Sequence, residues 1–102
     1  MDFKMELRQQ CGQATVLHVQ GDIDVCTSPA LQKQLSILIA TEDPLVEVDL
    51  GGVPYLDSSG VAVLMKAKRT LDGHGRDLKL LNVLPSVRRI FSVLALERYL
   101  AS

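Results

Sequence analysis

The sequence predicts an α/β fold with one mixed β-sheet and helices packed on it. Apolar runs of strand length alternate with longer runs of helical spacing, in the order β-β-α-β-α-β-α. Only a short connection separates the first two strands, and no internal repeat or linker interrupts the order. Because the chain has 102 residues, of which 47% are hydrophobic, we expect a single domain over residues 1–102 with one core.

The first two strands are expected to form an antiparallel hairpin. Apolar side chains recur at every second position of the first strand, which is typical of a half-buried strand, and they are Phe3, Met5 and Leu7. Residues 10–13 form the predicted turn, and residues 14–19 resume extended structure. Because the connection is so short, the two strands should pair antiparallel.

A helix is expected after the segment Gly21-Asp22-Ile23-Asp24. Ser28 as N-cap, with Pro29 as the first helical residue, is a strong start signal. One face of this helix is apolar and consists of Leu31, Leu35, Leu38 and Ile39. We expect the helix to end near residues 40–41.

The centre of the chain predicts an interior strand followed by a second helix. Residues 45–50 are mostly apolar or β-branched, and Gly51-Gly52 with Pro54 breaks the strand. Residues 61–71 have helical spacing, with an inward face made of Val61, Leu64, Met65 and Leu71. Gly73-His74-Gly75 marks the helix end, because glycine accepts the left-handed conformation found there.

The last third of the chain predicts a fourth strand and a third helix. Residues 78–81 form the strand, and Pro85-Ser86 opens the helix. The buried stripe of this helix is expected to consist of Val87, Ile90, Phe91 and Leu94. Residues 98–100 fit either a short last strand or a frayed end.

Composition excludes several classes of function. The net charge is −1, and there are only four aromatic residues, so neither nucleic acid nor an anionic membrane is an expected partner. The sequence contains no signal peptide and no stretch long enough to span a membrane, so we expect a cytoplasmic protein without membrane insertion. Cys11 and Cys26 lack the spacing of a metal site, and we expect free thiols.

No residue pattern supports an enzyme or a cofactor site. The chain lacks the Gly-x-Ser-x-Gly motif of hydrolases, and Gly51-Gly52 lacks the other residues of a phosphate-binding loop. Asp22 and Asp24 could join Asp57 in binding a metal ion if their loops converge, but solvated carboxylates are the more common outcome. We therefore expect no catalytic residues, no cofactor and no metal.

The most informative segment is Asp57-Ser58-Ser59-Gly60, which lies between a predicted strand and a predicted helix. Either serine hydroxyl could serve simply to cap the helix. A helix N-terminus also tolerates added negative charge, so a phosphate on a serine there need not unfold the domain. The segment therefore fits a helix cap or a reversible phosphorylation switch.

A receiver-like domain phosphorylated on aspartate is a rival hypothesis. Asp57 would be the acceptor, with Asp22 and Asp24 holding Mg²⁺ beside it. The chain opens with a predicted hairpin, however, and the acidic pair follows the second strand. Because a receiver needs about five β-α units, this hypothesis ranks well behind a serine switch.

Three segments in the same order and spacing resemble the STAS-domain family of anti-sigma factor antagonists. Residues 53–64, with Asp57-Ser58-Ser59-Gly60 at their centre, resemble its phosphorylation segment. The Gly21-Asp22-Ile23-Asp24 segment resembles the one between the family's second strand and first helix, and residues 84–91 resemble the start of its third helix. The resemblance implies four or five strands with helices packed on one side.

The resemblance also implies partner switching. The unphosphorylated antagonist would bind an anti-sigma factor that is also a serine kinase of the ATP-binding type, and a serine phosphatase would reverse the modification. Ser58 aligns with the phosphorylated serine, and Ser59 is a secondary candidate. The partner would bind what we call the docking surface, which consists of Asp22, Asp24, Thr27, Asp57, Ser58, Ser59, Gly60 and Val61.

A second function within the same family is a constitutive adaptor of a membrane transporter of the ABC type. The Ser-Ser pair favours the antagonist, because adaptor-type members often lack the full Asp-Ser-Ser-Gly pattern. The chain departs from the family at residues 101–102, where many members continue into a further helix. We therefore expect part of the sheet to be less covered.

Overall fold

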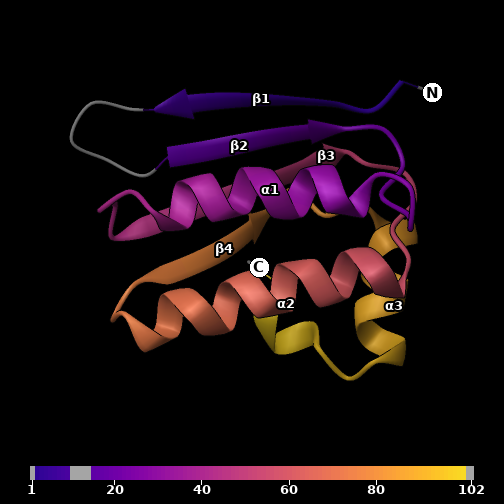
Figure 1. Ribbon diagram of the computed structural model, residues 1–102. Coiled ribbons are helices and arrows are strands. Elements are labelled where there is room, and N and C mark those ends of the chain that lie inside the picture. Colours follow the sequence, from indigo (N-terminus) through magenta and orange to yellow (C-terminus); the bar gives the residue numbers. More distant parts are fainter. Residues whose placement is uncertain (1, 10–14, 101–102) are drawn as a thin grey trace.

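The computed structural model describes residues 2–9 and 15–100, and Figure 1 shows its elements. The strands are β1 (Lys4–Gln9), β2 (Thr15–Gln20), β3 (Leu45–Gly52) and β4 (Asp77–Leu81). The helices are α1 (Ser28–Ile39), α2 (Ser58–Gly73) and α3 (Pro85–Val93), followed by the short 3₁₀ helix η1 (Glu97–Tyr99). The predicted element order is confirmed. The predicted turn at residues 10–13 and the thiol of Cys11 lie outside the described residues.

The four strands form one mixed sheet in the order β1-β2-β3-β4. Strands β1 and β2 pair antiparallel, which confirms the predicted hairpin. Strands β2 and β3 pair in parallel, as do β3 and β4, so α1 and α2 are the connections of two β-α-β units. Because both helices return the chain to the same end of the sheet, the loops that precede them lie at one end of the molecule (Figure 1).

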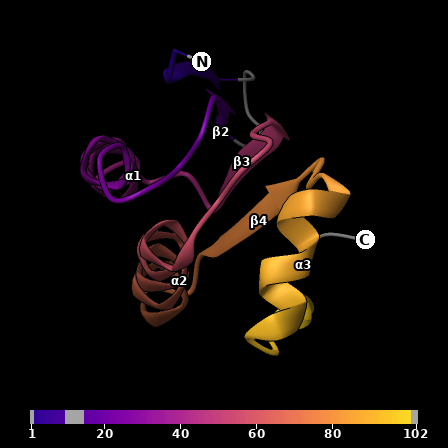
Figure 2. The ribbon, with the colours of Figure 1, turned by 90° about the vertical axis from the view of Figure 1, so that its right-hand side faces the viewer.

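Helices α1 and α2 cover one face of the sheet, and α3 lies beside β4 (Figure 2). Alternate residues of the inner strands point into this layer, and one row across the sheet joins the fully buried Leu17, Val48 and Leu80. The helices add Leu35, Leu64 and Phe91, each at most 2% exposed. The expected sheet with helices packed on one side is therefore confirmed, with four strands.

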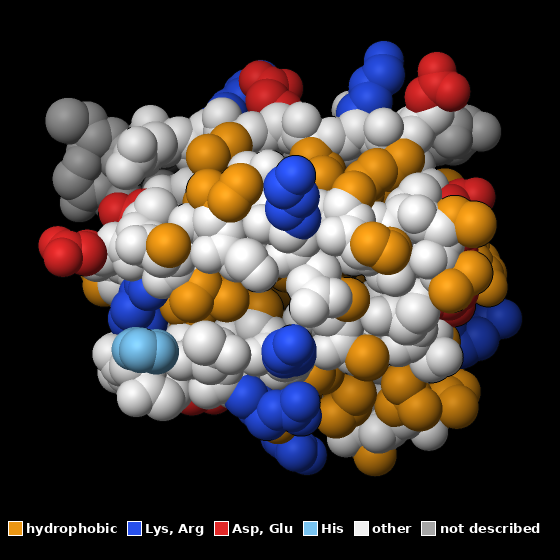
Figure 3. Space-filling view, in the orientation of Figure 1, with side chains coloured by type: hydrophobic (Ala, Val, Ile, Leu, Met, Phe, Trp, Pro, Cys, Tyr) orange, Lys and Arg blue, Asp and Glu red, His pale blue; other side chains and the backbone are white. Residues whose placement is uncertain are grey.

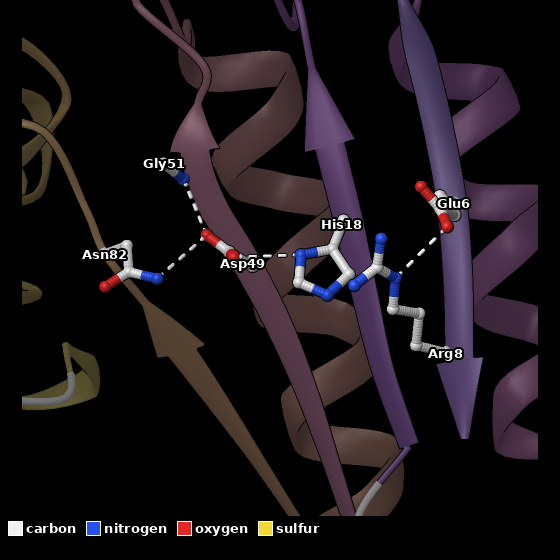
Figure 4. Close-up of polar contacts among 6 residues, drawn as sticks. All are labelled: Glu6, Arg8, His18, Asp49, Gly51 and Asn82. Atoms are coloured by element: carbon white, nitrogen blue, oxygen red, sulfur yellow. Dashed lines mark hydrogen bonds and ion pairs between the residues drawn. The ribbon is translucent and has the colours of Figure 1, made fainter. Parts of the chain in front are cut away.

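The opposite face of the sheet is polar (Figure 4). His18 on β2 lies 2.9 Å from Asp49 on β3, measured from Nδ1 to Oδ2. The other carboxylate oxygen of Asp49 accepts hydrogen bonds from the Gly51 amide at 2.8 Å and from the Asn82 side chain at 3.1 Å. Partial burial opposes ionisation of Asp49, but these three contacts together hold its pKa below the usual value. The network joins β2, β3 and the residue that follows β4.

Two local predictions are wrong. Ser28 is not the N-cap of α1: it is the first helical residue and is only 7% exposed, and Thr27 stands at the N-cap. The physical reason is a turn before the helix: the Ser28 amide donates to the Asp24 carbonyl at 2.8 Å, and the Thr27 carbonyl accepts from the Ala30 amide at 3.1 Å, so the helical bonding begins one residue earlier. Leu94 does not belong to the buried stripe of α3, because the helix ends at Val93 and leaves Leu94 42% exposed.

The predicted end of α2, with a glycine in the left-handed conformation, is confirmed. His74 is the C-cap, and Gly75 after it has the left-handed φ of 70° that favours glycine. For residues 98–100 the sequence fits a short last strand or a frayed end, and the structure shows neither form alone. Residues 97–99 form η1, and Leu100 then pairs with Leu80 in a single parallel bridge at the free edge of β4.

Arg76 has a structural role that sequence reasoning missed. Its guanidinium donates hydrogen bonds of 2.7 Å to the carbonyl oxygens of Ile39 and Asp43, at and beyond the end of α1. The last carbonyls of a helix have no partner within it, so a distant arginine satisfies them here. Within the described part of the chain, no helix has the length and apolar character needed to cross a bilayer.

Candidate functional site

Two loops meet at the end of the sheet where α1 and α2 begin. Residues 21–27 connect β2 to α1, and residues 53–57 connect β3 to α2. The Ile23 amide donates to the Tyr55 carbonyl at 2.9 Å, and the Asp57 amide donates to the Ile23 carbonyl at 3.1 Å. These bonds extend the parallel pairing of β2 and β3 past the strand ends. Asp24 and Asp57 each follow a bridged residue, so both carboxylates lie at this end of the sheet.

Asp57 is the N-cap of α2. Its Oδ1 accepts hydrogen bonds from the backbone amides of Ser59 at 2.9 Å and Gly60 at 3.3 Å, and from the Ser59 hydroxyl at 2.5 Å. The bond from the Ser59 hydroxyl is the largest cause that lowers the pKa of Asp57 below its usual value. The carboxylate is therefore ionised at neutral pH and satisfies two orphan donors of the helix.

The two serines have different environments. Ser59 is partly buried, and its hydroxyl donates to Asp57. Ser58 is exposed, and within residues 2–9 and 15–100 its hydroxyl has no hydrogen-bond partner. The capping role that either serine could have filled belongs to Asp57. This leaves the Ser58 hydroxyl in the first turn of a helix and open to reaction.

The side chains of the first loop bond mainly to one another. Oδ1 of Asp24 accepts from the amides of Cys26 at 2.9 Å and Thr27 at 3.1 Å. The Thr27 hydroxyl donates to the Asp22 carbonyl at 2.9 Å and accepts from the Asp24 amide at the same distance. These bonds fix the loop beside Ser58, and the thiol of Cys26 is free and exposed, as expected.

Gly60 and Val61 are buried residues in the first turn of α2, beneath the exposed Ser58. Val61 is 3% exposed, so its side chain belongs to the core. A side chain at Gly60 would lie 2.3 Å from Cδ1 of Leu56 and 2.6 Å from Cγ2 of Ile23. Glycine therefore allows the first turn of α2 to approach the two bridged loops closely.

The acidic residues of the two loops have local hydrogen-bond partners. Among the described residues, no three His, Cys, Asp or Glu side chains are placed to hold a metal ion. Oδ1 of Asp24 and Oδ1 of Asp57 accept hydrogen bonds from backbone amides and from a neighbouring hydroxyl, that of Thr27 or Ser59. With an antiparallel edge strand and only four strands, the fold also differs from the receiver-like alternative.

Sequence reasoning missed three residues on the segments around Ser58. Val25 and Tyr55 are large apolar side chains on the two loops, and they are 72% and 52% exposed. In the sequence, Val25 and Tyr55 are each an apolar residue within a polar loop. That pattern becomes informative about a shared surface only once the two loops are known to converge. The Ser86 hydroxyl at the start of α3 donates to the Pro54 carbonyl at 2.9 Å, so the third segment of the resemblance contacts the loop that precedes Ser58.

Comparison with known proteins identifies the family. The family model described as "Mlab, STAS domain" matches residues 7–101. The chain is 26% identical over 97 residues to an anti-sigma-B factor antagonist of Listeria monocytogenes, which covers 95% of this chain and 85% of the relative.

Two solved structures have the same fold. A crystal structure of an anti-sigma factor antagonist from Mycobacterium paratuberculosis superimposes with a TM-score of 0.86 at 25% identity, over 95% of this chain and 81% of that chain. The structure of the Bacillus cell fate determinant SpoIIAA in its phosphorylated form superimposes with a TM-score of 0.76 at 20% identity, over 96% of this chain and 89% of that chain. The chain therefore belongs to the STAS-domain family of anti-sigma factor antagonists.

Proposed function

We propose that this protein is a phosphorylation-controlled antagonist in a partner-switching pathway. With Ser58 unmodified it binds an anti-sigma factor, and phosphorylation of Ser58 releases it. The observation that supports this most strongly is the exposed Ser58 hydroxyl in the first turn of α2, beside an aspartate that already caps the helix. A hydroxyl without a capping role can be modified without loss of the cap.

The fold should tolerate the modification. A phosphoserine adds roughly −1.5 to −2 charges at neutral pH. At a helix N-terminus the free amides and the helix dipole stabilise negative charge by about 0.3–2 kcal/mol. Ser58 also faces solvent, so the phosphate keeps most of its hydration. The existence of a phosphorylated protein with the same fold is consistent with this tolerance.

A bound partner would not tolerate the modification equally well. Docking over Ser58 would remove water from the phosphate while Asp24 and Asp57 remain at the same end of the sheet. A penalty of about 4 kcal/mol would weaken binding roughly a thousandfold, which is enough for on/off control. The domain would keep its structure while its affinity changes.

Exposed apolar side chains would supply the affinity of the unmodified state. Val25 and Tyr55 lie on the paired loops, and Figure 3 shows hydrophobic side chains gathered at the end of the molecule where α1 and α2 begin. Interface energy is usually concentrated in a few such anchors, with tyrosine among the most frequent. We therefore add Val25 and Tyr55 to the docking surface, and Gly60 and Val61 support it from below.

The proposed partners follow from this role. The kinase would be the anti-sigma factor itself, of the ATP-binding type, and would transfer the γ-phosphoryl group of ATP to the Ser58 oxygen with release of ADP and a proton. A serine phosphatase would hydrolyse the ester. The protein would act in the cytoplasm as a substrate and binding module, since its family is non-catalytic.

Phosphate mapping tests the acceptor. The cognate kinase and ATP should add one phosphate, and mass spectrometry should locate it on Ser58. Ser58→Ala should abolish the modification, whereas Ser36→Ala, which alters another exposed serine, should leave it unchanged. Phosphate on Ser59 alone, or none on either serine, would contradict the proposal.

The family also leaves the transporter adaptor as a second candidate. An adaptor needs no reversible acceptor, so its partner should bind Ser58→Asp and the unmodified protein alike. Stable co-purification with an ABC-type ATPase that does not respond to Ser58→Asp would favour the adaptor. The exposed Ser58 within the Asp57-Ser58-Ser59-Gly60 turn favours the antagonist.

A further inference from the structure

Helices α1 and α2 leave a groove between them on the surface away from the sheet. Both helices run in the same direction, and Figure 3 shows the hydrophobic side chains that lie between them. Each helix contributes four residues at positions i, i+3, i+4 and i+7. The lining residues are Gln32, Leu35, Ser36 and Ile39 from α1 and Val63, Lys66, Ala67 and Thr70 from α2.

The shape of this groove suits a helix. Two helices that both present residues at i, i+3, i+4 and i+7 offer the pattern on which a third helix packs. The small side chains of Ser36 and Ala67 lie at equivalent positions of the two sets and allow a close approach. Leu35 and Ile39 give the groove an apolar floor, so the occupant needs an apolar stripe of its own.

The charges beside the groove specify the occupant further. Helix α1 contains one basic residue and no acidic residue, whereas α2 contains three basic residues and the single acid Asp72. Lys68 forms ion pairs with Asp72 at 3.0 Å and Asp77 at 2.5 Å. Lys33, Lys66 and Arg69 are exposed and, in the described part of the chain, have no acidic partner.

These three cations flank the groove on both sides. Lys66 lines it directly, Lys33 lies one helical turn from Ser36, and Arg69 lies one turn from Lys66. An occupant with acidic residues beside its apolar stripe would therefore meet opposite charge on both flanks. Blue side chains lie above and below the hydrophobic strip in Figure 3.

We propose that the α1–α2 groove binds an amphipathic helix of a partner protein, with an apolar stripe flanked by glutamate or aspartate. This site is separate from the Ser58 acceptor, because it begins one and a half turns further along α2, at Val63. Binding there does not depend on the proposed switch, and a partner could hold this groove while Ser58 changes state.

A designed peptide pair provides the probe. One labelled 18-residue helix would carry leucine at i, i+4, i+7 and i+11 with glutamate on both flanks, and the second would carry lysine in place of every glutamate. Fluorescence anisotropy at low salt should show the acidic peptide binding at least about tenfold more tightly than the basic one. Amide NMR shifts should map its contacts to the groove residues of α1 and α2.

Variants on the folded protein locate the site. Lys66→Glu with Arg69→Glu should reverse the preference between the two peptides, and Ser36→Phe should block the groove and weaken the acidic peptide. Lys79→Glu, on the exposed face of the sheet, and Ser58→Asp should leave binding unchanged. Circular dichroism would verify that every variant folds, and all five substituted positions are exposed.

Three results would overturn the proposal. The first is equal affinity of the two peptides or no binding of either. The second is NMR shifts on the exposed sheet face or the Ser58 loops in place of the groove. The third is a protein that does not bind the acidic peptide but binds phosphatidylglycerol vesicles, with vesicle binding lost in Lys66→Glu with Arg69→Glu. That result would assign the groove to a lipid surface.

Discussion

The Ser59 hydroxyl donates a hydrogen bond of 2.5 Å to Oδ1 of Asp57, and this bond separates the roles of the two adjacent serines. Ser59 belongs to the cap of α2, together with the Asp57 carboxylate. Ser58 precedes it by one residue and faces solvent. One helix turn therefore contains both the group that secures the helix and the group that we propose is modified.

The pKa of Asp57 should report this difference. The Ser59 hydroxyl is the largest cause of the lowered pKa, so Ser59→Ala should raise the pKa of Asp57 toward its usual value. Ser58→Ala is the matched control and should leave it unchanged. Carbon-detected NMR titration of the Asp57 carboxyl measures both. Equal shifts in the two variants would contradict the hydrogen-bond assignment.

The same carboxyl should contribute to the pH dependence of stability. Because its pKa is lowered in the folded state, its contribution is fully present above the unfolded pKa of about 4 and is lost as the pH falls through the folded pKa. Asp57→Asn should therefore lose less stability than the wild type between about pH 5 and pH 2. Urea unfolding across this range gives the comparison, and parallel curves for the two proteins would refute it.

Gly60→Ala should destabilise the domain by about 1–3 kcal/mol, because the added methyl collides with Ile23 and Leu56. Gly73→Ala in the same helix is the control. Nothing lies within 4 Å of a side chain there, so it should stabilise the protein by about 0.5–1 kcal/mol through helix propensity. Thermal and urea unfolding should show opposite signs, and stabilisation by both substitutions would disprove the close approach at Gly60.

Arg76→Ala should cost about 2 kcal/mol of unfolding free energy, because the Ile39 and Asp43 carbonyls lose a charged donor. Arg88→Ala, at an exposed arginine of α3, should change it by less than about 0.5 kcal/mol. Hydrogen exchange should also accelerate at the C-terminal end of α1 in Arg76→Ala. Equal stability of the two variants would argue against this role of Arg76.

Hydrophobic periodicity predicted the elements of the fold well, because this periodicity is set by the burial of one face of each element. The alternating strands and the apolar stripes of α1 and α2 are set by the face that each element buries, and that pattern is local in sequence. Leu94 broke the pattern of α3 because the helix ends one residue earlier, and the sequence has no signal at that boundary. Helix ends are the least predictable part of such an interpretation.

Contacts between distant segments could not be predicted in the same way. The start of α1 depends on a turn in which the Ser28 amide bonds to the Asp24 carbonyl, and this turn has no clear signal in the sequence. Arg76 and Ser86 reach carbonyls more than 30 residues away, at Ile39 and Pro54. The Asp57-Ser58-Ser59-Gly60 segment was recognised because its residues are adjacent in the sequence, whereas the convergence of the two loops required the structure.

Binding of the unmodified and fully phosphorylated protein to the cognate anti-sigma factor tests the central claim most directly. We predict that phosphate on Ser58 lowers the affinity by about a thousandfold, as measured by calorimetry. The circular dichroism spectrum and cooperative unfolding of the phosphorylated protein should remain those of a folded domain. Equal affinity of the two forms, or loss of the fold on phosphorylation, would contradict the account.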